Sequence, residues 1–149
     1  MKKIISLILS IVIVLGVPVC AAETDKIDEA LKKTLEYLCQ STDFPKYGSI
    51  GGEWLVLGLA RSGESVSEGF FENYYSDVSE KIKTNKGVLS NKKYTENSRV
   101  ILALTSIGKD AENIEGYNLL YPLGNFEKTI AQGLNGAIFA LLALDCGNY

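Results

Sequence analysis

Two kinds of helix alternate along this chain, and the alternation limits its fold more than any other feature. Residues 25–40 carry one apolar stripe that includes Ile27, Leu31 and Leu35, a pattern that predicts an amphipathic helix with one solvated face. Residues 54–60 are apolar nearly all round, which predicts a helix buried on most of its faces. Stacking the two kinds side by side predicts an all-α fold with a solvated outer layer and a buried inner layer.

The pair of helices is repeated further along the chain. A second amphipathic stripe over 70–82 precedes the apolar run 100–104, and Thr95 is expected to cap the N-terminus of that apolar helix. A third outer segment over 119–130 is interrupted by proline and glycine, and it precedes the apolar run 138–144. The residues that stop the apolar helices are Gly63, Gly108 and Gly147. They recur at intervals of about 40 residues, a period typical of helical-hairpin repeats, so the sequence predicts three hairpins.

The N-terminal segment has the pattern of an export signal. Lys2 and Lys3 precede an apolar run over 4–17, and small residues follow at Ala21 and Ala22. The run is shorter than the ~20 residues that a membrane-spanning helix needs. We therefore expect a signal peptide over 1–22 and a mature, secreted or cell-surface domain over 23–149, without a transmembrane span.

Three cysteines leave two questions open. Lipidation at Cys20 is an alternative to simple cleavage, although Val19 before it is larger than is usual at that position. Cys39 and Cys146 remain in the mature chain, and sequence alone does not decide whether they pair. The favoured interpretation is that both are small buried apolar residues.

Composition excludes several classes of function. The chain has 149 residues and no histidine, so Ser-His-Asp and Cys-His nucleophile systems, a histidine base and histidine metal sites are all excluded. The formal net charge of -3 argues against a nucleic-acid-binding protein. No cofactor and no metal ligand set is identified in the sequence.

Several motifs resemble the α/α-toroid superfamily. They are Gly48-Ser49-Ile50-Gly51-Gly52-Glu53-Trp54, Leu59-Ala60-Arg61-Ser62-Gly63, Tyr94-Thr95-Glu96-Asn97-Ser98-Arg99, Gly108-Lys109-Asp110 and Gln132-Gly133-x-Asn135-Gly136. That superfamily includes terpene cyclases, protein prenyltransferase β subunits, the complement thioester domain and the cobalamin carriers intrinsic factor and transcobalamin. Over 25–149 the chain most resembles secreted bacterial proteins with prenyltransferase/squalene-cyclase-type repeats, which implies an α/α toroid.

The enzyme hallmarks of the superfamily are missing from the sequence. Squalene cyclases have Gln-x-x-x-Gly-x-Trp before their inner helices, and here the glutamine position is Gly48; their Asp-x-Asp-Asp run does not occur. The prenyltransferase zinc site needs histidine. The thioester motif Cys-Gly-Glu-Gln is replaced by Cys146-Gly147-Asn148-Tyr149. These departures favour a protein that is not an enzyme.

The resemblance implies a ligand site at the mouth of the toroid, where the loops enter the inner helices. The implied residues are Glu53, Trp54, Asn97, Arg99 and Asn135. Helix N-termini suit an anionic or polar ligand, Trp54 offers a surface for stacking, and Arg99 offers a bidentate donor. The alternative is structural: Glu53 caps a helix, Trp54 fills the core and Arg99 pairs with a neighbouring carboxylate.

A closed toroid takes about six hairpins, so three hairpins correspond to about half a ring. The last apolar helix then has no outer neighbour, and we expect an exposed apolar edge that associates with a missing half or with another copy. The function expected from these features is non-catalytic binding of a cofactor or cell-envelope ligand. The alternatives are the N-terminal part of a terpene-cyclase-like or lyase enzyme, and a repeat scaffold for protein–protein contacts.

Overall fold

The computed structural model describes residues 21–48, 51–147 and 149. The predicted signal peptide and Cys20 therefore lie outside the described residues, apart from the backbone of Ala21 and Ala22. The elements in chain order are α2 (Ala21–Ser41), α3 (Glu53–Ser62), α4 (Phe70–Thr84), α5 (Tyr94–Ser106), the 3-10 turn η1 (Tyr121–Gly124), α6 (Phe126–Ile130) and α7 (Leu134–Asp145). No strand occurs in this part of the chain, which confirms the all-α prediction.

The chain divides into two compact units, Met1–Leu38 and Cys39–Tyr149. The first contains most of α2, the helix predicted over 25–40, on which Glu29 and Lys33 form an exposed ion pair at 2.7 Å. Among the described helices of the chain, none combines the length and the apolar character that crossing a membrane requires.

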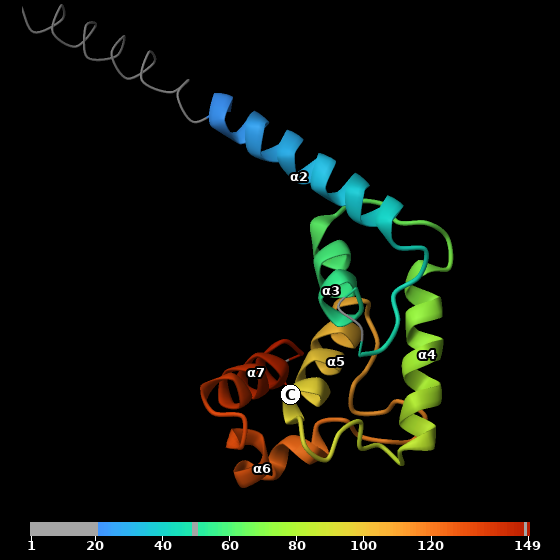
Figure 1. Ribbon diagram of the computed structural model, residues 1–149, viewed down its shortest axis with the longest axis vertical. Helices are drawn as coiled ribbons and strands as arrows, with labels where there is room; N and C mark the ends of the chain where they lie inside the picture. The colour runs from blue at the N-terminus through green and yellow to red at the C-terminus, as the bar shows by residue number, and fades with distance from the viewer. Residues whose placement is uncertain (1–20, 49–50, 148) are drawn as a thin grey trace, which may run out of the picture. The chain divides into compact units, whose positions relative to one another are not determined.

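The core of the second unit lies around α5, against which α3 and α7 pack (Figure 1). Val100, Ile101 and Leu104 of α5 have no exposed surface, as their apolar run predicts. The stripe of α4 is buried as well, with Tyr74 and Val78 fully enclosed in the same core. Helix α4 is thus buried along one stripe, and α5 is buried over most of its length.

Helix α7 is less buried than α5 although its sequence is more apolar. Leu134, Ile138, Leu141 and Leu142 are 81%, 50%, 68% and 48% exposed, so this helix is not enclosed as α5 is. In α3, for which burial on most faces was predicted, the buried residues are only Glu53, Leu55, Val56 and Leu59. The buried residues of α7 are small ones, Gly136, Ala140 and Ala143. The physical reason is that α5 and α6 cover only one face of α7. The expected exposed apolar edge is present there.

The ends of the helices follow their local sequence with one exception. Gly63 adopts the left-handed conformation after α3, at φ 77°, and the outer segment at 121–130 is broken into η1 and α6 as Pro122 and Gly124 predict. Thr95, however, is not the N-cap of α5, because the helix begins at Tyr94. The Gln132 Oε1 atom instead accepts hydrogen bonds from the Thr95 N–H and hydroxyl, both at 3.1 Å.

Candidate functional site

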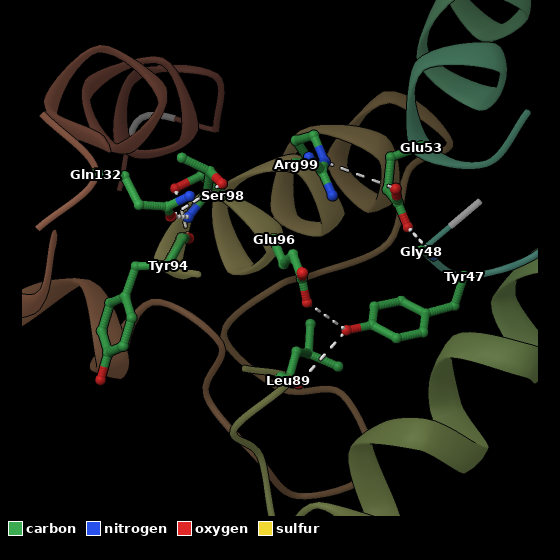
Figure 2. A network of polar contacts seen from close by, with 10 residues as sticks. Tyr47, Gly48, Glu53, Leu89, Tyr94, Glu96, Ser98, Arg99 and Gln132 are labelled. Carbon is green, nitrogen blue, oxygen red and sulfur yellow. Dashed lines mark hydrogen bonds and ion pairs between the residues drawn. The ribbon is translucent and has the colours of Figure 1, made fainter. Parts of the chain in front are cut away.

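A polar network joins the start of α3 to the first turns of α5. Figure 2 shows Glu53 of α3 and Arg99 of α5 pointing toward each other. Glu53 is only 2% exposed; its Oε1 accepts the Gly48 N–H at 2.8 Å, and its Oε2 lies 3.7 Å from the Arg99 Nε. The Glu53 carboxylate therefore fixes the Gly48 backbone and lies next to the Arg99 guanidinium, with no hydrogen bond to the Arg99 Nε.

Tyr47, which precedes Gly48, connects the same network to Glu96 of α5 and to Asp77 of α4. Its hydroxyl lies 3.3 Å from a Glu96 carboxylate oxygen and 3.4 Å from the Leu89 carbonyl oxygen (Figure 2), and its N–H donates to Asp77 of α4 at 2.7 Å. Burial, followed by the negative charge of Glu96, raises the pKa of the Tyr47 hydroxyl above its usual range. The phenol thus stays neutral and serves as a donor to an acidic neighbour.

Four buried side-chain groups have no hydrogen-bond partner in the described part of the chain: the Tyr74 hydroxyl, the Ser79 hydroxyl, the Asn97 Nδ2 and the Arg99 Nε. The Glu53 carboxylate acts electrostatically on the Tyr74 hydroxyl and lies beside the Arg99 Nε. Tyr74 has no exposed surface, while the Arg99 side chain is 24% exposed. Burial, and after it the Glu53 charge, raises the pKa of the Tyr74 hydroxyl well above its usual range, so this group also remains a neutral donor. Buried polar groups are normally satisfied, so such orphans require an explanation.

The other predicted site residues have separate roles. Asn97 is 1% exposed, and its Oδ1 accepts the Leu89 N–H at 3.2 Å, which fixes the loop before α5, while its Nδ2 has no hydrogen-bond partner among the described residues. Trp54 is 46% exposed and packs edge-on against Phe139 of α7, with ring centroids 5.6 Å apart. Asn135 is exposed on α7. Of the five predicted residues, Glu53 and Arg99 are thus the pair brought together by an ion pair.

The structural alternatives are partly correct. Arg99 does pair with a carboxylate, that of Glu53. Glu53 does not cap α3, because its acceptor is used by the N–H of a residue that precedes the helix. Trp54 lies at the edge of the core and not inside it. Sequence reasoning missed Tyr47 and Tyr74 as members of the site, since Tyr74 lies on an apolar stripe and was explained by packing.

The cysteines and acidic residues form no further centre in the described part of the chain. Cys39 and Cys146 are free thiols. Cys146 is exposed and Cys39 half-buried, so the interpretation of both as buried apolar residues is wrong, because Cys146 follows the end of α7 where no helix covers it. No group of three or more acidic or cysteine side chains capable of holding a metal ion occurs among the residues described.

Comparison with known proteins returns no similar chain: no family profile, curated protein or solved structure matches this sequence or its fold.

Proposed function

We propose that the chain is an exported, non-catalytic binding module of the α/α-toroid type, with a signal peptide over 1–22 and three helical hairpins over 23–149. The proposal is supported by the motifs that resemble the superfamily, by the alternation of striped and apolar helices, and by the packing of α5 against both α3 and α7. The first residue of the exported protein is then expected at Glu23 or next to it, which N-terminal sequencing checks.

The observation that carries the binding proposal concerns two of the four unpartnered groups, the Tyr74 hydroxyl and the Arg99 Nε. A buried donor without a partner costs about 1–3 kcal/mol of desolvation that no hydrogen bond offsets. A ligand oxygen that accepts from Arg99 and Tyr74 would remove this cost. The Arg99 side chain is 24% exposed, but its Nε and the Tyr74 hydroxyl are themselves enclosed, so the ligand must displace the side chains that cover them. The ligand expected here is rich in acceptors, such as a phosphate ester or a set of amide oxygens.

The resemblance to cobalamin carriers suggests the first probe. A corrinoid carries both a phosphodiester and peripheral amides. The oxygen atoms of these groups accept hydrogen bonds and would serve as partners for the Arg99 Nε and the Tyr74 hydroxyl. Its colour also makes binding easy to measure without a label. We therefore propose cyanocobalamin as the test ligand for this site.

Arg99→Gln is expected to weaken cyanocobalamin binding by about 10–100-fold, because a hydrogen bond to a charged group contributes about 1.5–3 kcal/mol. Tyr74→Phe should also weaken binding while leaving the unligated protein equally stable or slightly more stable, since it removes a buried donor that has no partner. Titration calorimetry measures the affinity, and urea unfolding measures the stability.

The matched control is Arg61→Gln, which removes an exposed arginine at the end of α3 and should leave binding unchanged. A wild-type protein that retains no corrinoid after spin filtration would reject the carrier proposal. A destabilised Tyr74→Phe variant would mean that the hydroxyl has a partner within the fold, which contradicts the proposal that it is a donor awaiting a ligand.

A second candidate, a scaffold for protein–protein contacts, is favoured by the exposed apolar side chains of α7. Leu134 and Leu141 are 81% and 68% exposed on a helix whose covered face uses only small residues. Exposed apolar surface of this kind marks interaction sites in soluble proteins. The scaffold proposal assigns this surface to a further helical hairpin of the same repeat type.

In the scaffold proposal, the isolated protein associates with itself because the apolar face finds no other partner. Sedimentation velocity is expected to show an average mass that rises with protein concentration. Leu141→Glu should abolish that rise, because burying an unpaired charge in an interface is unfavourable, whereas Ser76→Glu on the exposed side of α4 should not. A wild-type protein that stays monomeric at all concentrations contradicts the scaffold proposal.

A further inference from the structure

A groove of about 770 Å³ opens beside the start of α5, η1 and α6. Its volume falls within the roughly 300–1,000 Å³ of known ligand pockets. The lining residues that matter here are Tyr94, Glu112, Asn118, Tyr121, Asn125 and Lys128. None of them belongs to the Glu53–Arg99 network, and Figure 2 shows the Tyr94 side chain lying apart from that pair. The groove is therefore a separate feature of the molecule.

Two asparagines of the groove are held in place by their own backbone surroundings. The Asn118 Oδ1 accepts the Leu120 N–H at 2.8 Å, and the Asn125 Oδ1 accepts the Lys128 N–H at 3.1 Å. Each amide thus has its oxygen occupied and its orientation set, while its NH₂ group carries two donors. Both side chains are exposed, so the donors are available to a bound molecule without rearrangement.

The side chain of Tyr121 lines the same groove and is largely exposed to solvent. Tyr121 is 86% exposed, and it opens η1 directly before Pro122, whose ring restricts the backbone there. A large ring left in water favours contact with any apolar face that comes within reach. Tyr121 therefore offers a flat stacking surface beside the two oriented amides.

The charges of the groove balance. Glu112 supplies an acceptor carboxylate, and Lys128 supplies a cation whose Nζ lies 5.8 Å from the centre of the Tyr94 ring. One negative and one positive group give no net preference for a charged ligand. The preferred ligand is neutral, accepts from amides and ammonium, donates to a carboxylate, and has one apolar face.

We propose that this groove binds a neutral carbohydrate. A sugar ring has hydroxyls that accept from Asn118, Asn125 and Lys128 and donate to Glu112, and it has a C–H face that packs on the Tyr121 ring. A flat nucleobase lacks the ring of hydroxyls, and a phosphorylated ligand finds only one cation here. This inference does not depend on the toroid assignment or on corrinoid binding, because the two sites share no residue.

The test uses the purified protein with two probes, triacetylchitotriose and maltotriose, in calorimetry and in amide NMR titration. At least one probe is expected to bind, with shifts concentrated over 118–128. Asn118→Asp retains an oxygen for the Leu120 N–H and removes the NH₂ donors, so it should weaken binding about 10-fold while the melting temperature is unchanged. Tyr121→Ala is expected to weaken binding by at least the same factor.

Phe126→Ala is the matched control, because Phe126 is 71% exposed at the start of α6 and does not line the groove. It should leave the affinity unchanged. The proposal is overturned if neither oligosaccharide binds, if Asn118→Asp binds as tightly as the wild type, or if Phe126→Ala and Tyr121→Ala lose affinity equally. Which of the two probes binds decides between N-acetylated and plain hexoses.

Discussion

Replacing Leu104 by alanine is expected to lower the free energy of unfolding by about 3 kcal/mol, whereas the same change at Leu141 should alter it by less than about 0.5 kcal/mol. Both residues lie on helices with apolar sequences, but Leu104 has no exposed surface and Leu141 is 68% exposed. Truncating Leu104 leaves a cavity between packed helices. Truncating Leu141 removes contacts mainly with water.

Urea unfolding followed by circular dichroism at 222 nm measures both values, at a protein concentration low enough to exclude association. The two variants serve as controls for each other, since the chemical change is identical. Equal losses would contradict the arrangement around α5, because they would mean that α7 is covered to the same extent. A loss at Leu141 that grows with protein concentration would point to association through α7.

Gly136→Ala is expected to destabilise the fold by about 2–3 kcal/mol. A Cβ atom at this position would overlap the Thr129 carbonyl oxygen, which belongs to the backbone of α6 and cannot rotate away. The glycine is buried where α6 crosses α7. Any side chain here forces the two helices apart, and closely packed interiors accommodate such shifts only at a cost.

The control for this variant is Gly58→Ala in α3. A Cβ there would meet no atom within 4 Å, so alanine should stabilise the helix by about 0.5–1 kcal/mol through its higher helix propensity. Thermal unfolding of the two variants is therefore expected to shift in opposite directions. A Gly136→Ala protein as stable as the wild type would show that α6 and α7 do not approach so closely in solution.

Local sequence was sufficient for most of the helices. The stripe of α4 predicted a helix with Tyr74 and Val78 on its buried face, and both are fully enclosed. Proline and glycine at 122 and 124 predicted the break between η1 and α6. These features depend on neighbouring residues along the chain, on side-chain periodicity and on backbone preference, so no knowledge of the tertiary structure was needed.

The site was predicted less completely, for reasons of distance along the chain. Glu53 and Arg99 were named from motifs, and they form an ion pair, but their closeness depends on how α3 packs on α5. The cap of α5 was assigned to Thr95, whereas the acceptor is Gln132, 37 residues away. A hydrogen bond between such remote residues leaves no local pattern. The position of Tyr74 on an apolar stripe likewise predicts its burial, but it does not predict whether its hydroxyl has a hydrogen-bond partner.

Sequence by itself determined that this chain is all-α, where its helices lie, and that histidine-dependent chemistry is excluded. The repeat count predicted an exposed apolar edge at the last apolar helix, but tertiary structure decided which side chains form it: α5 is buried between neighbours, and α7 presents leucines to solvent while it buries small residues. The physical reason is that periodicity records which side chains avoid water, while burial depends on what packs against them. In the described part of the chain, α5 and α6 pack against one face of α7, and the buried residues of that face are the small ones Gly136, Ala140 and Ala143.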